Sequence, residues 1–135
     1  MTEYIYVAGA VIRNHDGDVL CALRSVTMSM PGLWEFPGGK LEPNESAEEC
    51  LVREIEEELG CAIQVGRQIA DVIYEYPSIR VRLVTYESKL ASGTPVAREH
   101  ERLLWLPVSR LTELEWAPAD WPTVDALRRS ESHES

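Results

Sequence analysis

The densest cluster of chemically reactive side chains in this 135-residue chain lies between Glu45 and Gly60. A single arginine, Arg53, accompanies seven glutamates there: Glu45, Glu48, Glu49, Glu54, Glu56, Glu57 and Glu58. The segment has the pattern of a helix, although like charges four residues apart destabilise an isolated helix. So much negative charge predicts either a solvated acidic face or a site for bound cations.

The spacing of these residues separates a core face from an acidic face. At about 100° per residue, one apolar stripe is formed by Leu51, Val52, Ile55 and Leu59. Glu54, Glu57 and Glu58 fall together on an adjacent face. Carboxylate and carbonyl oxygens are the preferred ligands of Mg²⁺ and Mn²⁺, which proteins commonly share with substrate phosphates. A Gly-Gly turn at 38–39 lets the backbone approach a ligand closely, so the sequence favours the cation site.

The limits of this helix are also predicted. Ser46 is the expected N-cap, Glu49 completes a capping box three residues later, and Gly60 ends the helix. Arg53 is spaced to pair with Glu49 and Glu57, which offsets part of the repulsion.

The remaining segments predict strands around two helices. Strands are expected at 4–14, 19–25, 33–36, 62–76, 79–90 and 102–107, a short helix or turn at 108–114, and a second helix at 120–130. We expect one α/β (α+β) domain over residues 1–129, a mixed sheet with helices packed on it, and a disordered tail at 130–135.

Composition excludes several classes of protein. The net charge of -10 and the pI near 4.7 argue against a nucleic-acid polymer as partner. The three cysteines show no C-x-x-C spacing, so we expect buried thiols rather than disulfides or a zinc site. No apolar run has membrane-spanning length and the N-terminus lacks a basic start, which predicts a cytoplasmic protein with no membrane partner. A monomer and a homodimer are both compatible with the sequence.

The spacing from Gly39 to Cys61 resembles the Nudix box. With U a bulky apolar residue, the pattern G-x5-E-x7-R-E-U-x-E-E-x-G-U is met at Gly39, Glu45, Arg53, Glu54, Ile55, Glu57, Glu58, Gly60 and Cys61. The segments "LWEFPGGK", "YEYP" and "WAPADWP" are similar to the MutT-like branch of that family. The resemblance implies an α/β/α sandwich and hydrolysis of nucleoside triphosphates between the α and β phosphorus, releasing nucleoside monophosphate and pyrophosphate.

The resemblance also implies roles for individual residues. Mg²⁺, with Mn²⁺ as an alternative, would be held by Glu54, Glu57 and Glu58, by a carbonyl of Gly38 or Gly39, and by Glu99 from the loop before the last strand. Glu54 is also the candidate to orient or deprotonate the attacking water. Arg53 is expected to orient the glutamates, and Arg24 matches a position on the substrate side.

The site for the base is less defined by the sequence. Trp34 or Phe36 is expected either to stack on the base or to lie in the core, and Lys40 is a nearby cation. Asp120 is either a base-reading residue or the N-cap of the last helix. An ionised Asp120 would accept from the exocyclic amine of cytosine, which favours the small-molecule nucleotides CTP and dCTP.

Other functions remain open at this point. A buried, neutral Asp120 would suit 8-oxo-dGTP or another oxidised purine triphosphate. A dinucleoside polyphosphate or a nucleotide sugar would need space beyond the last phosphate. A non-catalytic Nudix-like module that binds a nucleotide is a further alternative, although such modules usually have an eroded box and the glutamates here are intact.

Overall fold

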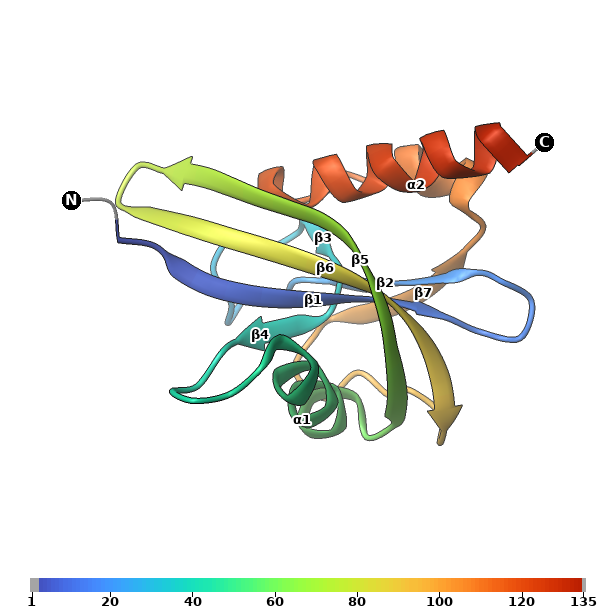
Figure 1. The fold of residues 1–135 in the computed structure, drawn as a ribbon, viewed down its shortest axis with the longest axis horizontal. Helices are drawn as coiled ribbons and strands as arrows, with labels where there is room; N and C mark the ends of the chain where they lie inside the picture. Colours follow the sequence, from blue (N-terminus) through green and yellow to red (C-terminus); the bar gives the residue numbers. More distant parts are fainter. Residues whose placement is uncertain (1–2, 135) are drawn as a thin grey trace.

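A mixed sheet of seven strands forms the centre of the molecule (Figure 1). The computed structural model describes the backbone of residues 3–134 and the side chains of residues 3–131. The strands are β1 (Ile5–Arg13), β2 (Val19–Leu23), β3 (Trp34–Glu35), β4 (Gly38–Lys40), β5 (Ala62–Tyr76), β6 (Ile79–Ser92) and β7 (Arg102–Leu106). Their order is β3-β2-β1-β6-β5, with β4 paired to β1 and β7 paired to β2. Only β1 and β6 pair in parallel within the described residues.

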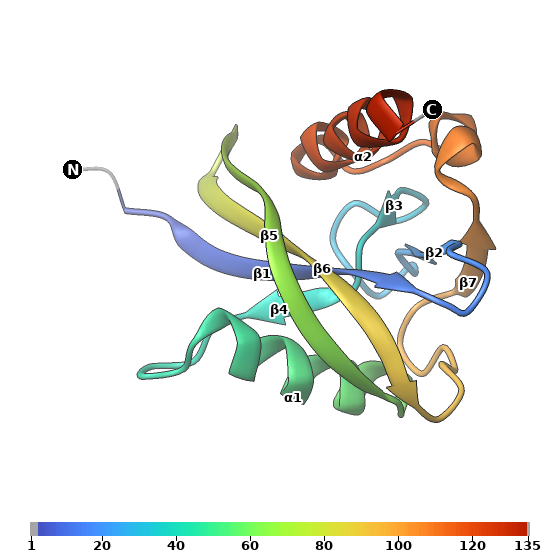
Figure 2. The same cartoon turned by 45° about the vertical axis from the view of Figure 1, so that its right-hand side comes forward.

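Helices cover both faces of the sheet (Figures 1 and 2). Helix α1 (Ala47–Leu59) lies on one face, and α2 (Trp121–Glu134) lies on the other with the short helices η1 (Val108–Glu113) and η2 (Pro118–Asp120). Each face has its own apolar core: Leu51, Ile55 and Leu59 of α1 pack on one side, and Val124 and Leu127 of α2 pack on the other. The predicted sandwich is therefore confirmed.

Helix α1 begins and ends where the sequence predicts. The Ser46 side chain accepts from the backbone N–H of Glu49, and the Glu49 carboxylate accepts from the N–H of Ser46. Gly60 ends the helix with φ 69°, a left-handed conformation that glycine adopts without steric cost. This capping fixes which glutamates point toward the sheet and which toward solvent.

Two expectations about the backbone differ from the structure. The Gly-Gly pair at 38–39 is part of strand β4, antiparallel to β1, rather than a turn. Helix α2 continues to Glu134, beyond the expected start of a disordered tail at 130, and Ser135 lies outside the described residues. The sequence contains no glycine or proline after Pro122, so no helix-breaking residue ends α2 earlier.

Two composition-based expectations can be compared with the structure. Cys21, Cys50 and Cys61 are buried with free thiols, as expected. Over residues 3–134, none of the helices combines the length and the apolar character needed to cross a membrane.

Candidate active site

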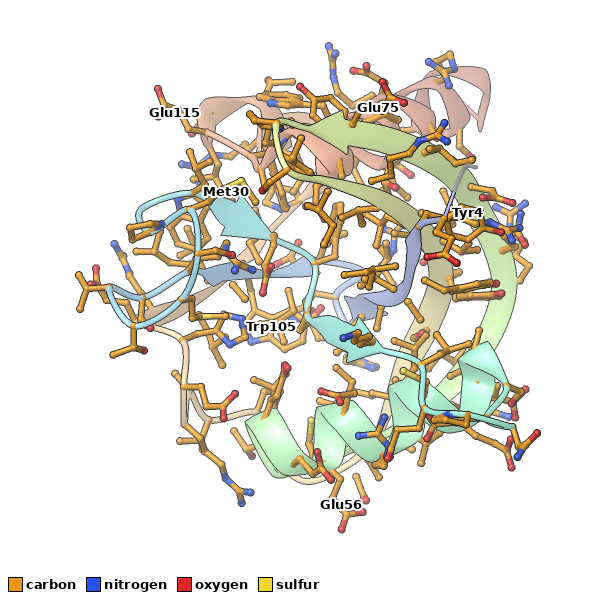
Figure 3. The ribbon with its side chains drawn as sticks, turned by 90° about the vertical axis from the view of Figure 1, so that its left-hand side faces the viewer. Tyr4, Met30, Glu56, Glu75, Trp105 and Glu115 are labelled. Carbon is orange, nitrogen blue, oxygen red and sulfur yellow. The ribbon has the colours of Figure 1, made fainter. Side chains whose placement is uncertain are left out.

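Strand β4 brings the acidic face of α1 against the sheet. Figure 3 views this side of the molecule, with α1 below β4 and α2 above it. The Glu54 side chain is 18% exposed and lies against Gly39. A Cβ atom on Gly39 would lie 2.5 Å from the Glu54 carboxyl group, and one on Gly38 would overlap the carbonyl oxygen of Ala8. Gly38 therefore needs glycine for space, because β4 lies against the backbone of β1, whereas a side chain at Gly39 would displace the Glu54 carboxyl group.

Glu58 is the most perturbed carboxyl group of this cluster. Burial first, and then the negative charges of Glu54, Glu35 and Glu99, raise its pKa to about 9. Its Oε2 atom is buried and has no hydrogen-bond partner. A buried oxygen without a hydrogen-bond partner is costly, and the charged groups that act most on Glu58 are all carboxylates, so a cation would supply the missing partner.

Arg53 connects the glutamates on the solvent side of the cluster. Its guanidinium donates to Glu45 at 2.8 and 2.9 Å and to Glu54 at 2.7 Å, and it lies 3.4 Å from Glu57. The pairing expected with Glu49 is not formed, because Glu49 serves the capping box. Arg53 lowers the pKa of Glu45 to about 2 and keeps this carboxylate charged. Glu57 is the exposed member of the set, with a side chain 61% exposed.

These residues fit a divalent cation. The donors are hard oxygens, one of them unpartnered, beside the glycine backbone of β4. Within residues 3–131, no three His, Cys, Asp or Glu side chains are grouped closely enough to hold a metal ion by themselves. An open arrangement is typical of Mg²⁺ sites, since this ion keeps several waters and takes further ligands from substrate phosphates.

A cavity of about 500 Å³ lies on the other side of β4. Its walls are mainly apolar, with Val7, Val81 and Leu83 from the sheet, and its polar groups include Arg24, Glu35, Lys40 and Asp120. A mostly apolar cavity with a few convergent polar groups is the usual form of a small-molecule site. Because Gly38 lines the cavity while Gly39 touches Glu54, the cavity and the carboxylate cluster adjoin across one short strand.

The two expected aromatic residues differ in position. Phe36 lines the cavity and stacks on Trp116, with ring centroids 4.6 Å apart. Trp34 points into the core beneath α2 and is not among the cavity-lining residues of the described chain. Of the two, only Phe36 is placed to contact a bound molecule.

Asp120 forms part of the cavity wall. Its Oδ1 atom accepts the backbone N–H of Phe36 at 3.2 Å, and within the described residues no donor from the first turn of α2 reaches this carboxyl group. Burial, and next the charge of Glu35, raise the pKa of Asp120 well above its usual value. The N-cap alternative therefore lacks its hydrogen bond, and the carboxyl group tends to the neutral form in the metal-free, ligand-free protein.

Glu35 was missed by sequence reasoning, although it lies between the cluster and the cavity. It pairs with Arg24 on one side and accepts from His100 Nε2 at 2.8 Å on the other. Its charge acts on both Glu58 and Asp120. Arg24 also donates to Ser29, so it holds Glu35 and the loop over the cavity rather than projecting freely. On that loop Met30, labelled in Figure 3, lines the cavity.

Comparison with known proteins identifies the family. The NUDIX domain model matches residues 3–127. The chain belongs to the Nudix family. It is 38% identical over 125 residues to the CTP pyrophosphohydrolase of Escherichia coli K12. This alignment covers 93% of this chain and 92% of that protein. It is 29% identical over 125 residues to the 8-oxo-dGTP diphosphatase of the same organism, covering 93% and 97%.

A solved structure has the same architecture. The solution structure of the Escherichia coli ORF135 protein matches with a TM-score of 0.84 and 35% identity, covering 98% of this chain and 94% of that one. The chain is thus a Nudix hydrolase, and Nudix hydrolases generally use a divalent metal ion. The carboxylate cluster on α1 coincides with the Nudix box read from the sequence.

We expect Glu58→Gln to stabilise the metal-free Nudix domain. The folded pKa lies near 9, above the unfolded value of 4.5, so the folded state binds more protons and stability falls as the pH rises between these values. Glutamine removes this cost. At pH 8 in EDTA, calorimetry should give a Tm higher by about 3–8 °C, as for a change of about 1–2 kcal/mol.

The same measurement at pH 5 serves as its control. There most wild-type Glu58 is protonated in the folded state, so the two proteins should melt within about 2 °C of each other. Adding Mg²⁺ at pH 8 should raise the wild-type Tm and leave the variant nearly unchanged. A variant less stable than wild type at pH 8 would show that Glu58 is a satisfied structural residue.

Proposed function

We propose that this Nudix hydrolase is a Mg²⁺-dependent nucleoside triphosphate pyrophosphohydrolase that prefers CTP and dCTP. The observation that carries the proposal is the cavity with Asp120 and Glu35, which adjoins the carboxylate cluster across β4. A nucleotide whose base occupies this cavity would have its phosphates beside α1. The names of the two enzymes from Escherichia coli support a nucleoside triphosphate as the substrate class.

The polar groups of the cavity suit the hydrogen-bonding edge of cytosine. Glu35, paired with Arg24, is a hydrogen-bond acceptor. Asp120, whose pKa is raised, can donate through its protonated oxygen while Oδ1 accepts from Phe36. Cytosine presents an amine donor beside the N3 acceptor, so an acceptor and a donor on the protein match it. This proposal assigns the acceptor to Glu35 and the donor to Asp120, whereas the sequence alone favoured an ionised Asp120 as the acceptor.

An oxidised purine triphosphate such as 8-oxo-dGTP is the second candidate. The observation that favours it is also the raised pKa of Asp120, because a neutral carboxyl group can donate to guanine O6. Glu35 would then accept from the N–H groups of the purine. The two candidates differ in the order of donors and acceptors along the base edge, and a comparison of rates can separate them.

The residues beside the phosphates have separate roles in the proposed reaction. When bound, the divalent cation supplies charge neutralisation and a lower pKa for coordinated water. Glu54, held between Gly39 and Arg53, orients the attacking water and accepts its proton. The water oxygen bonds to phosphorus, the P–O bond of the α–β bridge breaks, and nucleoside monophosphate and pyrophosphate leave. Lys40, exposed at the end of β4, is a cation near this position.

The roles of the metal ligands can be tested at Glu57. Glu57→Gln should lower kcat by about 10²-fold or more, because a carboxylate ligand is lost while the exposed side chain contributes little to folding. Glu56→Gln is the matched control, since Glu56 is exposed on the same turn and points away from the sheet (Figure 3). Rates come from pyrophosphate release with Mg²⁺ and with EDTA. A fully active Glu57→Gln would contradict the assignment.

The preference for the base can be tested with a panel of triphosphates. We expect kcat/KM for CTP and dCTP to exceed that for dTTP and GTP by about tenfold or more, since one well-placed polar pair discriminates by about 1–3 kcal/mol. Asp120→Asn should keep this ratio, because its amide can donate in place of the protonated oxygen while Oδ1 still accepts from Phe36. Asp120→Leu, which removes the donor, should reduce the ratio without abolishing turnover. If 8-oxo-dGTP is the best substrate of the panel, the second candidate holds. Equal rates on all bases would refute the role of the cavity.

A further inference from the structure

The loop that joins β6 to β7 carries Glu99 on exposed backbone. Residues 93–101 form neither helix nor strand, and Glu99 itself is exposed. Such loops are usually more mobile than the elements they connect. The residues around Glu99 nevertheless contact the end of α1, the helix that carries Glu54 and Glu58, through Arg98 and Val96. Contacts on both sides of Glu99 therefore fix where this loop runs.

The residue before Glu99 binds the end of α1. Arg98 Nη1 donates to the carbonyl oxygens of Glu56 and Glu57 at 3.3 and 3.1 Å. These carbonyls belong to the last turn of α1, which contains no basic residue of its own. A cation here satisfies terminal carbonyls and interacts favourably with the helix dipole. The loop is held at a second point by Val96, whose N–H donates to the Leu59 carbonyl at 2.9 Å.

The residue after Glu99 binds the strand next to the cavity. The His100 side chain is fully buried, and its Nε2 donates to Glu35 at 2.8 Å. This contact joins residues that are 65 positions apart in the sequence. The following residue, Glu101, donates its backbone N–H to Leu23 at 3.0 Å and leads the chain into β7.

We propose that Arg98 and His100 are positioning residues, which anchor the loop on both sides of Glu99 and hold this carboxylate beside those of α1. Arg98 fixes the loop to the helix that carries Glu54 and Glu58, and His100 fixes it to Glu35 on β3. The contact of His100 also ties the loop at residues 93–101 to Glu35, which lines the cavity beside β4. The catalytic part of this proposal rests on the proposed function; the anchoring itself does not.

The anchoring can be measured without metal or substrate. In EDTA, amide hydrogen exchange at Val96 and Glu101 reports the two hydrogen bonds that close the loop. Arg98→Met, which keeps an apolar stem, should speed exchange at Val96 by about tenfold or more. Arg110→Met is the matched control, because Arg110 makes an exposed pair with Glu113 in η1 and should leave both amides unchanged. Unchanged exchange in Arg98→Met would overturn the anchor.

Kinetics then test whether the anchors act through Glu99. Arg98→Met should lower kcat about tenfold, since a small displacement of a catalytic group is costly. Combined with Glu99→Gln, it should add little to the loss from Glu99→Gln alone, because the residue it positions is already gone. If the fold-losses in kcat of the two single variants multiply in the double variant, Arg98 acts independently of Glu99, against the proposal.

His100 is tested by a conservative rescue. His100→Leu removes the donor to Glu35, whereas His100→Gln places an amide N–H near the Nε2 position. We expect His100→Leu to lower kcat and to raise KM for CTP, and His100→Gln to recover most of both. If both variants fold and show the same loss in kcat and the same rise in KM, the hydrogen bond is refuted as the anchor.

Failure of this anchor can be told apart from failure of the proposed function. A wild-type protein that cleaves no triphosphate would refute the proposed function, while hydrogen exchange in His100→Gln and His100→Leu would still decide the anchoring.

Discussion

Repulsion among carboxylates at the junction of α1, β4 and β3 is the constraint on which the rest of the site depends. Glu58 is half-buried beside Glu54, the charges of Glu35 and Glu99 also act on it, and one of its oxygens has no donor. Without a bound cation this arrangement opposes folding at neutral pH, because Glu58 must take up a proton that it does not hold in the unfolded chain. It persists because the apolar cores on the two faces of the sheet fix the backbone on which these residues sit. Stability elsewhere thus maintains a site that is ready for cations.

The cations of the protein are placed around the cluster rather than within it. Arg53 pairs with Glu45 and Glu54 from the solvent side, Arg24 pairs with Glu35 from the cavity side, and Arg98 binds the end of α1. Each holds a carboxylate or its backbone in place, while the charges that act most on Glu58 are those of other carboxylates. A divalent cation, which Nudix hydrolases generally use, would offset this negative charge. This explains why a helix with so poor an intrinsic charge pattern belongs to a folded enzyme.

The parts of the site that the sequence predicted are those set by local geometry. The capping of α1 by Ser46 and Gly60, and the face shared by Glu54 and Glu58, follow from helical periodicity and cap chemistry. The packing of one helix on each face of the sheet follows from the apolar residues that recur along the helices and strands. Gly38 and Gly39 were correctly singled out but assigned to a turn, because a sequence cannot show that two other elements come within contact of a strand.

What the sequence did not predict depends on contacts between distant segments. The hydrogen bonds of Glu35 with His100, and of Phe36 with Asp120, span 65 and 84 residues. These contacts place Glu35 between the carboxylates of α1 and the cavity, and its charge raises the pKa of both Glu58 and Asp120. A change in the pairing of Glu35 would therefore act on both sides of β4. The carboxylate cluster and the cavity are consequently linked through one half-buried carboxyl group, rather than being two independent regions on a common scaffold.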